Sequence, residues 1–239
     1  KLYKEKPAYI IGEIESMRTE NEKFFKMSDG SIQTAIYNSA VHFKDENGKF
    51  QNINNNLKSI NDNEYVTTKS KNSIILSKNY KSGKTVEIIS DDVNISWGFV
   101  GTNITKAILE KKEEKLNGDE KFTSLPNTVS TTIYKNIFNN IDAEYILNGE
   151  KIKENLILNN KTDLNEFEIE YRFKKLTPIQ KDEKTIELKN KNNKIVYTIT
   201  APLMTDDNGI TSDALTLTIL SVKNNKMSVK LSANKEWLQ

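Results

Sequence analysis

The 239-residue chain contains no cysteine, a single histidine, and only two arginines, Arg18 and Arg172. Without cysteine it can form neither a disulfide framework nor a thiolate zinc site, and it offers no thiol nucleophile. One histidine excludes a histidine-rich metal centre and leaves His42 as the only imidazole available for acid–base catalysis. These absences exclude several common kinds of catalytic and metal centre.

An excess of one charge sign is also missing, because 35 Lys and Arg balance 33 Asp and Glu, for a net charge of +2. Proteins that bind phosphate backbones usually carry a basic excess and arginine clusters. We therefore expect no nucleic-acid partner, and we expect the many Asn and Lys residues to lie on a solvated surface. No apolar run approaches the roughly 20 residues of a membrane-spanning helix, so no membrane span is expected.

The chain does contain short runs of alternating apolar and polar residues separated by turn residues, which is typical of antiparallel sheet. Phe167–Phe173 alternates throughout, with aromatic and aliphatic residues on one side and charged residues on the other. Asp45–Gly48 reads DENG between two such runs and predicts a hairpin. The other strand candidates are Lys23–Met27, Ser31–Tyr37, Ser73–Ser77, Thr85–Ser90, Val93–Val100, Ala143–Leu147, Glu154–Leu158, Thr185–Lys189, Lys194–Thr200, Ala214–Leu220 and Lys226–Ser232.

Helical signal is confined to Thr105–Leu116, and the charged stretch Lys111–Lys121 reads as a surface hairpin tip or loop, with a short exposed helix as the alternative. The strands exceed the roughly seven of a simple sandwich. We therefore predict an all-β fold: a large, supersandwich-like two-sheet antiparallel β-sandwich forming one module over residues 1–239. The alternative is two sandwich halves, 1–110 and 125–239, joined near residues 110–130. We prefer the single module, because no Gly/Ser/Pro-rich linker separates the two halves.

Four stretches carry a family resemblance: Asn21–Leu57, Tyr134–Leu158, Tyr197–Leu217 and Met227–Leu238. Together they resemble the N-terminal β-rich region of large wall-associated proteins secreted by Gram-positive bacteria, which carry Rhs (YD) repeats, and of relatives with a DNRLRE-type domain. The resemblance implies a secreted or cell-wall location and further modules of the same polypeptide as partners. It also implies a role in structure, adhesion or toxin delivery. It carries no catalytic residue, so we expect no enzymatic activity.

Two carboxylates and a lysine mark the second of these stretches. Asp142 begins one predicted strand, and Lys153 and Glu154 return in the next after an Asn-Gly turn, which predicts a structural ion pair across a hairpin. The alternative is a glycosidase acid and base formed from Asp142, Glu144 or Glu154. We name no catalytic residue.

Two further sites are candidates for binding. Trp97 and nearby Phe99 offer aromatic rings on which a sugar ring stacks. The loop containing Asp206, Asn208 and Asp213 supplies oxygen ligands beside a glycine, the chemistry that Ca²⁺ prefers, although a plain β-turn fits the same residues. His42 lies in an alternating strand and reads as a surface residue.

Three functions remain open from the sequence. The first is a non-catalytic structural or adhesive module of an exported surface protein. The second is a carbohydrate-binding module for cell-wall or host glycans. The third is a glycan-active enzyme. No cofactor is expected apart from the calcium ion considered above.

Overall fold

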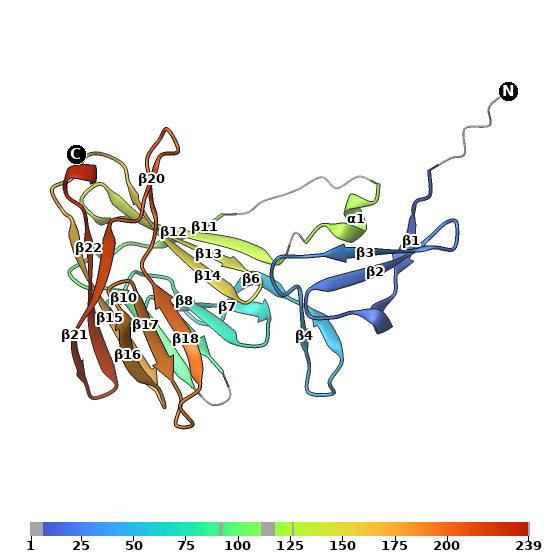
Figure 1. Ribbon diagram of the computed structural model, residues 1–239, viewed down its shortest axis with the longest axis horizontal. Helices are drawn as coiled ribbons and strands as arrows, with labels where there is room; N and C mark the ends of the chain where they lie inside the picture. The colour runs from blue at the N-terminus through green and yellow to red at the C-terminus, as the bar shows by residue number, and fades with distance from the viewer. Residues whose placement is uncertain (1–6, 91–92, 111–117, 126, 239) are drawn as a thin grey trace.

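The computed structural model describes residues 7–90, 93–110, 118–125 and 127–238. Within these residues the regular structure is almost entirely antiparallel β-sheet, which confirms the predicted all-β sandwich class (Figure 1). Among them, no helix is both long and apolar enough to cross a membrane. The helical segments are α1 (Glu120–Thr123), the 3-10 turn η1 (Glu15–Met17) and the 3-10 turn η2 (Glu236–Leu238).

The largest sheet has eight strands, in the order β21 (Leu215–Lys223), β22 (Lys226–Ala233), β15 (Glu166–Lys174), β10 (Asn94–Phe99), β9 (Val86–Ile89), β8 (Ser73–Ser77), β7 (Glu64–Lys69) and β6 (Asn54–Ser59). A four-stranded sheet has the order β11 (Ala107–Glu110), β12 (Val129–Phe138), β13 (Ile141–Asn148) and β14 (Lys151–Leu158). A three-stranded sheet contains β16 (Thr177–Asp182), β17 (Thr185–Lys189) and β18 (Ile195–Thr200).

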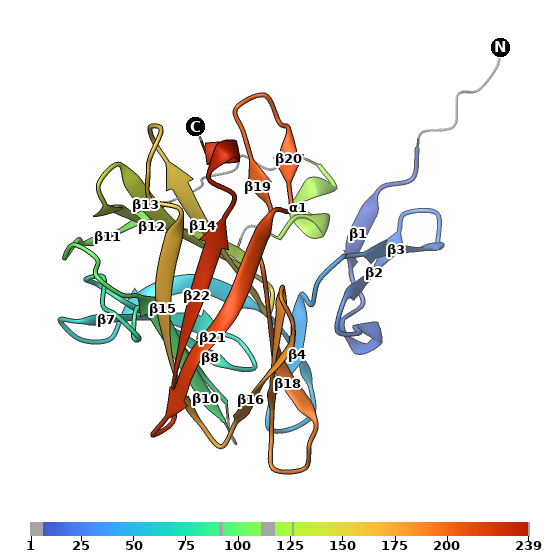
Figure 2. The same ribbon diagram turned by 60° about the vertical axis from the view of Figure 1, so that its left-hand side comes forward.

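The four- and three-stranded sheets pack on the eight-stranded sheet and enclose one hydrophobic core (Figure 2). The alternation of strand β15 explains how the core forms. Its aromatic and aliphatic residues are buried and the charged residues between them face outward, as predicted; the buried ones are Phe167, Ile169, Tyr171 and Phe173. Two short hairpins complete this part of the chain, β4 (His42–Lys44) with β5 (Phe50–Asn52) around the predicted DENG turn, and β19 (Met204–Thr205) with β20 (Thr211–Ser212).

The alternative division into two halves near residues 110–130 would separate strands that belong to the same sheet. Strands β6 to β10 precede it and strands β15, β21 and β22 follow it, yet all share the eight-stranded sheet, with β10 and β15 as direct neighbours. Residues 107–110 form strand β11, paired with β12, because long-range pairing overrides the local helix propensity of this segment. Most of the charged stretch Lys111–Lys121 lies outside the described residues.

A small sheet stands apart at the N-terminal end (Figure 1) and contains β1 (Ile10–Glu13), β2 (Glu22–Met27) and β3 (Ile32–Ile36). Ile10, Phe25 and Met27 form its own core, against which Phe122 of α1 packs. His42 lies beside this sheet and is fully buried, so the prediction of a surface histidine is wrong. Its Nδ1 lies 2.7 Å from the carbonyl oxygen of Thr19, a backbone contact that the strand pattern does not reveal.

Candidate functional site

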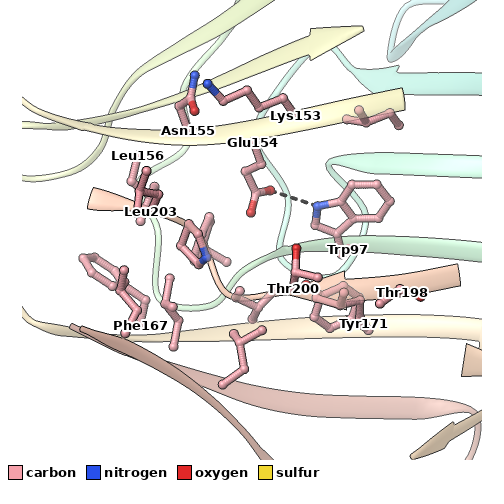
Figure 3. Close-up of a pocket in the computed structure, with 18 of the residues that line it drawn as sticks. Trp97, Lys153, Glu154, Asn155, Leu156, Phe167, Tyr171, Thr198, Thr200 and Leu203 are labelled. Carbon is pink, nitrogen blue, oxygen red and sulfur yellow. Dashed lines mark hydrogen bonds between the residues drawn. The ribbon is translucent and has the colours of Figure 1, made fainter. Parts of the chain in front are cut away.

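A cavity of about 890 Å³ lies between the two layers of the sandwich (Figure 3). Strands β10 and β15 of the eight-stranded sheet line one side, and β14, β18 and the segment around Leu203 line the other. Close-packed protein interiors leave few voids larger than a water molecule, whereas small-molecule sites occupy roughly 300–1,000 Å³. The volume is therefore that of a binding site rather than of a packing defect.

An aromatic wall forms where β10 pairs with β15. Trp97 lies directly opposite Tyr171 in the register, and their rings are nearly parallel, with centroids 6.2 Å apart and an interplanar angle of 25°. Trp97 is half-buried, so solvent in the cavity reaches its ring. Period-two alternation places Trp97 on the cavity face of β10, together with the neighbouring Phe99.

The predicted sugar-binding pair is unequal in the structure. Both residues line the cavity, but only 1% of Phe99 is exposed, because its ring packs edge-to-face against Phe138 and Phe167 at centroid distances of 6.2 and 6.0 Å. Trp97 therefore presents the accessible ring, and Phe99 belongs to the packed core behind it.

Glu154 of β14 places a carboxylate group in the lining of the cavity. Figure 3 shows its carboxylate pointing into the cavity from β14, while the neighbouring Lys153 and Asn155 point away. The indole Nε1 of Trp97 donates a hydrogen bond of 2.9 Å to Glu154 Oε2. Burial raises the pKa of the Glu154 carboxyl, and hydrogen bonds from Tyr145 and Trp97 offset only part of that effect. Within the described chain, no lysine or arginine forms an ion pair with Glu154.

Two buried tyrosines, Tyr145 and Tyr80, form a chain of hydrogen bonds that ends at the Glu154 carboxylate. Tyr145 lies opposite Glu154 in the β13–β14 register and hydrogen bonds to its carboxylate. The hydroxyls of Tyr145 and Tyr80 lie 3.0 Å apart, and the backbone N–H of Phe99 donates to the Tyr80 hydroxyl over 3.1 Å. Burial raises the pKa values of both tyrosines, so both stay neutral and able to donate. The carboxylate is thus held in place by its protein donors while it faces the open cavity.

The predicted ion pair of Asp142, Lys153 and Glu154 is not formed. Asp142 is buried and accepts hydrogen bonds from Lys135 Nζ at 2.8 Å and from the Asn136 backbone N–H at 2.7 Å. In the register, Asp142 lies opposite Ile157, whereas Lys153 lies four residues further along, opposite Ile146. That offset is about 13 Å at the usual rise per residue of a strand.

The same register separates the acidic residues of the glycosidase alternative. Asp142 and Glu144 lie on one face of β13, whereas Glu154 lies opposite Tyr145 and points into the cavity from the other face. Asn155 Nδ2 donates to Glu144 over 2.6 Å. Asp142 and Glu154 therefore do not converge on a common substrate position, as a glycosidase acid and base must.

The predicted calcium ligands have other partners. Asp206 Oδ1 accepts hydrogen bonds from the backbone N–H groups of Asn208 and Ile210, at 3.0 and 2.7 Å, which closes the β19–β20 turn. Asp213 pairs with Lys184 Nζ at 2.8 Å. Across the described ranges, no group of three or more His, Asp or Glu side chains is arranged to hold a metal ion. The geometry is that of the plain β-turn that the sequence left as the alternative.

The sequence named Trp97 and Glu154 as candidates, but it placed Glu154 in an ion pair with Asp142 and Lys153, and it did not single out the tyrosines. A signal was present: in Glu154–Leu158 the apolar residues Leu156 and Leu158 share a strand face with Glu154, so an inward-facing carboxylate follows from the alternation alone. Tyr80 and Tyr145 come from distant strands, and nothing in their spacing predicts that they meet.

Comparison with known proteins identifies relatives along most of the chain. The chain is 27% identical over 229 residues to the tRNA3(Ser)-specific nuclease WapA of Bacillus spizizenii and 26% identical over 229 residues to the tRNA nuclease WapA of Bacillus subtilis. Each alignment covers 94% of this chain but only 9% of the relative. The chain is also 28% identical over 205 residues to the wall-associated protein of Geobacillus stearothermophilus, covering 82% of this chain and 76% of that protein.

No known family profile matches the chain, and no solved structure does. The names of the Bacillus relatives contradict two expectations from the sequence, that the protein is not an enzyme and that it has no nucleic-acid partner. Both expectations rested on absences, and the balanced net charge of this chain says nothing about the parts of those relatives that it does not match. The expected surface location agrees with the name of the Geobacillus relative. Over most of its length, the chain is similar to wall-associated proteins of Bacillus and Geobacillus.

Proposed function

We propose that this chain is a recognition module of a cell-wall protein and that it binds a wall glycan in the cavity between its sheets. The observation that carries the proposal is the half-buried Trp97, held by Glu154 at the wall of an 890 Å³ cavity. The wall-associated name of the Geobacillus relative supports the location.

The chemistry of the cavity suits a sugar. A pyranose has apolar faces that stack on an aromatic ring and hydroxyl edges that hydrogen bond. Trp97 offers the ring, and Glu154, Thr198 and Thr200 offer polar groups along the same lining. Apolar residues of β15 and β21 form the remaining wall.

Binding to wall material tests the proposal directly. The purified chain is incubated with isolated bacterial cell walls and with a glycan array, beside a Trp97→Ala variant. A Tyr9→Ala variant is the matched control, because Tyr9 is 63% exposed and lies in the N-terminal segment. We expect retention by walls to fall about tenfold or more for Trp97→Ala, since buried aromatic contacts dominate such sites, and to stay unchanged for Tyr9→Ala. Equal retention of all three proteins, or retention of none, would contradict the proposal.

The wider context is part of the proposal. Residues 1–239 act as one structural and adhesive module that positions other modules of a longer polypeptide, as the resemblance to Rhs-repeat and DNRLRE-domain proteins implies. The continuous eight-stranded sheet supports a single unit from β6 onward, since it combines strands that precede and follow residues 110–130. Limited proteolysis tests this: a single protected fragment that spans β6 to β22 is expected, and separable fragments that break between residues 110 and 130 and remain folded would contradict it.

The names of the Bacillus relatives favour a second candidate, contact with tRNA. Because the chain matches only 9% of those proteins, the experiment must use the purified chain itself. Incubation with total tRNA followed by denaturing gel electrophoresis detects cleavage, and a native gel detects binding. Either signal would support this candidate, and the absence of both would remove it for residues 1–239.

A further inference from the structure

We infer that the cavity selects a cationic ligand, an organic ammonium such as the free amine of a de-acetylated amino sugar, with Glu154 as its counter-charge. The inference rests on the proposed function and names its substrate class. It is argued from the surroundings of one carboxylate.

Glu154 is a half-buried carboxylate, and no lysine or arginine among the described residues pairs with it. A buried charge is expected to be paired, because removing it from water costs several kcal/mol that only an opposite charge or several hydrogen bonds recover. Among the residues that the structure describes, Trp97 and Tyr145 donate to the carboxylate, and Lys153, the adjacent cation in the sequence, points out of the cavity (Figure 3). The position for a positive charge therefore lies in the cavity.

The aromatic wall beside Glu154 favours the same kind of ligand. A cation over the face of a tryptophan or tyrosine is attracted by the π system within about 6 Å of the ring, most strongly where water is excluded. Trp97 is half-buried on the cavity lining and hydrogen-bonded to Glu154, and the buried ring of Tyr171 stacks beside it. A carboxylate and an aromatic ring that face one cavity are elements of an ammonium-binding site.

A neutral N-acetyl group fits this position less well. A carboxylate only accepts hydrogen bonds, so an acetamide can offer Glu154 its single N–H but brings no positive charge, and its carbonyl oxygen would be repelled. A free ammonium donates hydrogen bonds and also brings the missing charge. The two sugars differ only in the acetyl group, so the preference between them reports on Glu154 alone.

The test compares chitosan oligomers with chitin oligomers of the same length by isothermal titration calorimetry. At about pH 6 most of the free amine is protonated, although the neighbouring ring oxygens make it less basic than an ordinary α-amino group, which titrates near 7.7. We expect the de-acetylated oligomer to bind at least about tenfold more tightly than the acetylated one. The variant Glu154→Gln keeps an acceptor for Trp97 and should reduce the preference to within about twofold. Glu168→Gln is the matched control, because Glu168 is an exposed carboxylate on the outer face of β15.

The outcomes separate the inference from the proposed function. Equal binding of both oligomers, or an unchanged preference in Glu154→Gln, would overturn the inference and leave sugar binding in place. Binding of neither oligomer, nor of isolated walls, would overturn both. Choline serves as a further probe, because its quaternary ammonium carries charge without hydrogen-bond donors. Choline should compete with the chitosan oligomer in the wild type but not in Glu154→Gln, and competition in both would count against Glu154 as the counter-charge.

Discussion

Asn55 supports a sharp prediction about stability. Its side chain is fully buried, and its amide Nδ2 donates to two backbone carbonyls, that of Thr128 at 2.7 Å and that of Gly149 at 2.8 Å. The amide therefore connects β6 to the segment before β12 and to the β13–β14 turn. Replacing Asn55 with alanine leaves both carbonyls without these donors.

The expected cost follows from those two hydrogen bonds. An unsatisfied buried polar group costs about 1–3 kcal/mol, and water entering the space left by the side chain will recover part of it. The Thr128 carbonyl keeps a second donor, the backbone N–H of Gly149 at 3.1 Å, so Asn55→Ala should lower the free energy of unfolding by about 1–3 kcal/mol. Asn55→Asp should cost more at neutral pH than at acidic pH, because a charged acceptor would then face two carbonyl oxygens.

Urea denaturation followed by circular dichroism measures the effect, and the neighbouring asparagine provides the control. Asn56 is exposed and makes a side-chain hydrogen bond of 2.8 Å to Asn127, so Asn56→Ala should change stability by less than about 0.5 kcal/mol. An Asn55→Ala protein as stable as Asn56→Ala, with an unchanged denaturant slope, would refute the reasoning.

Three further predictions concern other parts of the molecule. Gly98→Ala should lower the melting temperature, since its Cβ would lie 2.3 Å from a backbone carbonyl oxygen and overpacking costs about 1–3 kcal/mol, whereas Gly12→Ala meets no atom within 4 Å and should not. For Asp142, burial raises the pKa, but the hydrogen bonds from Lys135, the Asn136 backbone and Asn159 outweigh it together with the charge of Lys135, so the pKa lies below the ordinary value of 3.8. The stability that Asp142 contributes is therefore present above that value and lost as pH falls through the lowered pKa. Asp142→Asn should be less stable than the wild type at neutral pH, with the two melting curves converging in acid; a constant difference would contradict this. A chelator should leave the melting temperature unchanged, and a calcium-dependent rise would restore the loop at residues 206–213 as a metal site.

The sequence predicted the fold class and much of the strand pattern because burial with a period of two leaves a direct trace. Phe167–Phe173 is the clearest case: a shift of one residue would move its aromatic side chains into water, so the sequence allows one orientation only. The hairpin at Asp45–Gly48 was predictable for a local reason, the turn chemistry of Asn and Gly.

Contacts between distant strands leave no recognisable pattern in the sequence. Asn54, Asn55 and Asn56 are identical in type, and only the packing of remote backbone carbonyls makes the middle one a buried donor. Likewise, the hydrogen bond between Trp97 and Glu154 joins residues 57 positions apart, and no spacing rule predicts it. The sequence could therefore predict which strand face each residue of the candidate site lies on, but not which residues of distant strands it contacts.

The pairing of β10 with β15 also bears on how the chain folds. These strands are neighbours in the largest sheet, yet β11 to β14 lie between them in the sequence. Closing so long a loop before any contact compensates for it is slow, and folding rates fall as the sequence separation of contacting residues grows. While β15 is still unmade, β10 remains a free edge, able to pair with a strand of another molecule. The protein is thus expected to collapse late and to be most prone to aggregate during its own synthesis.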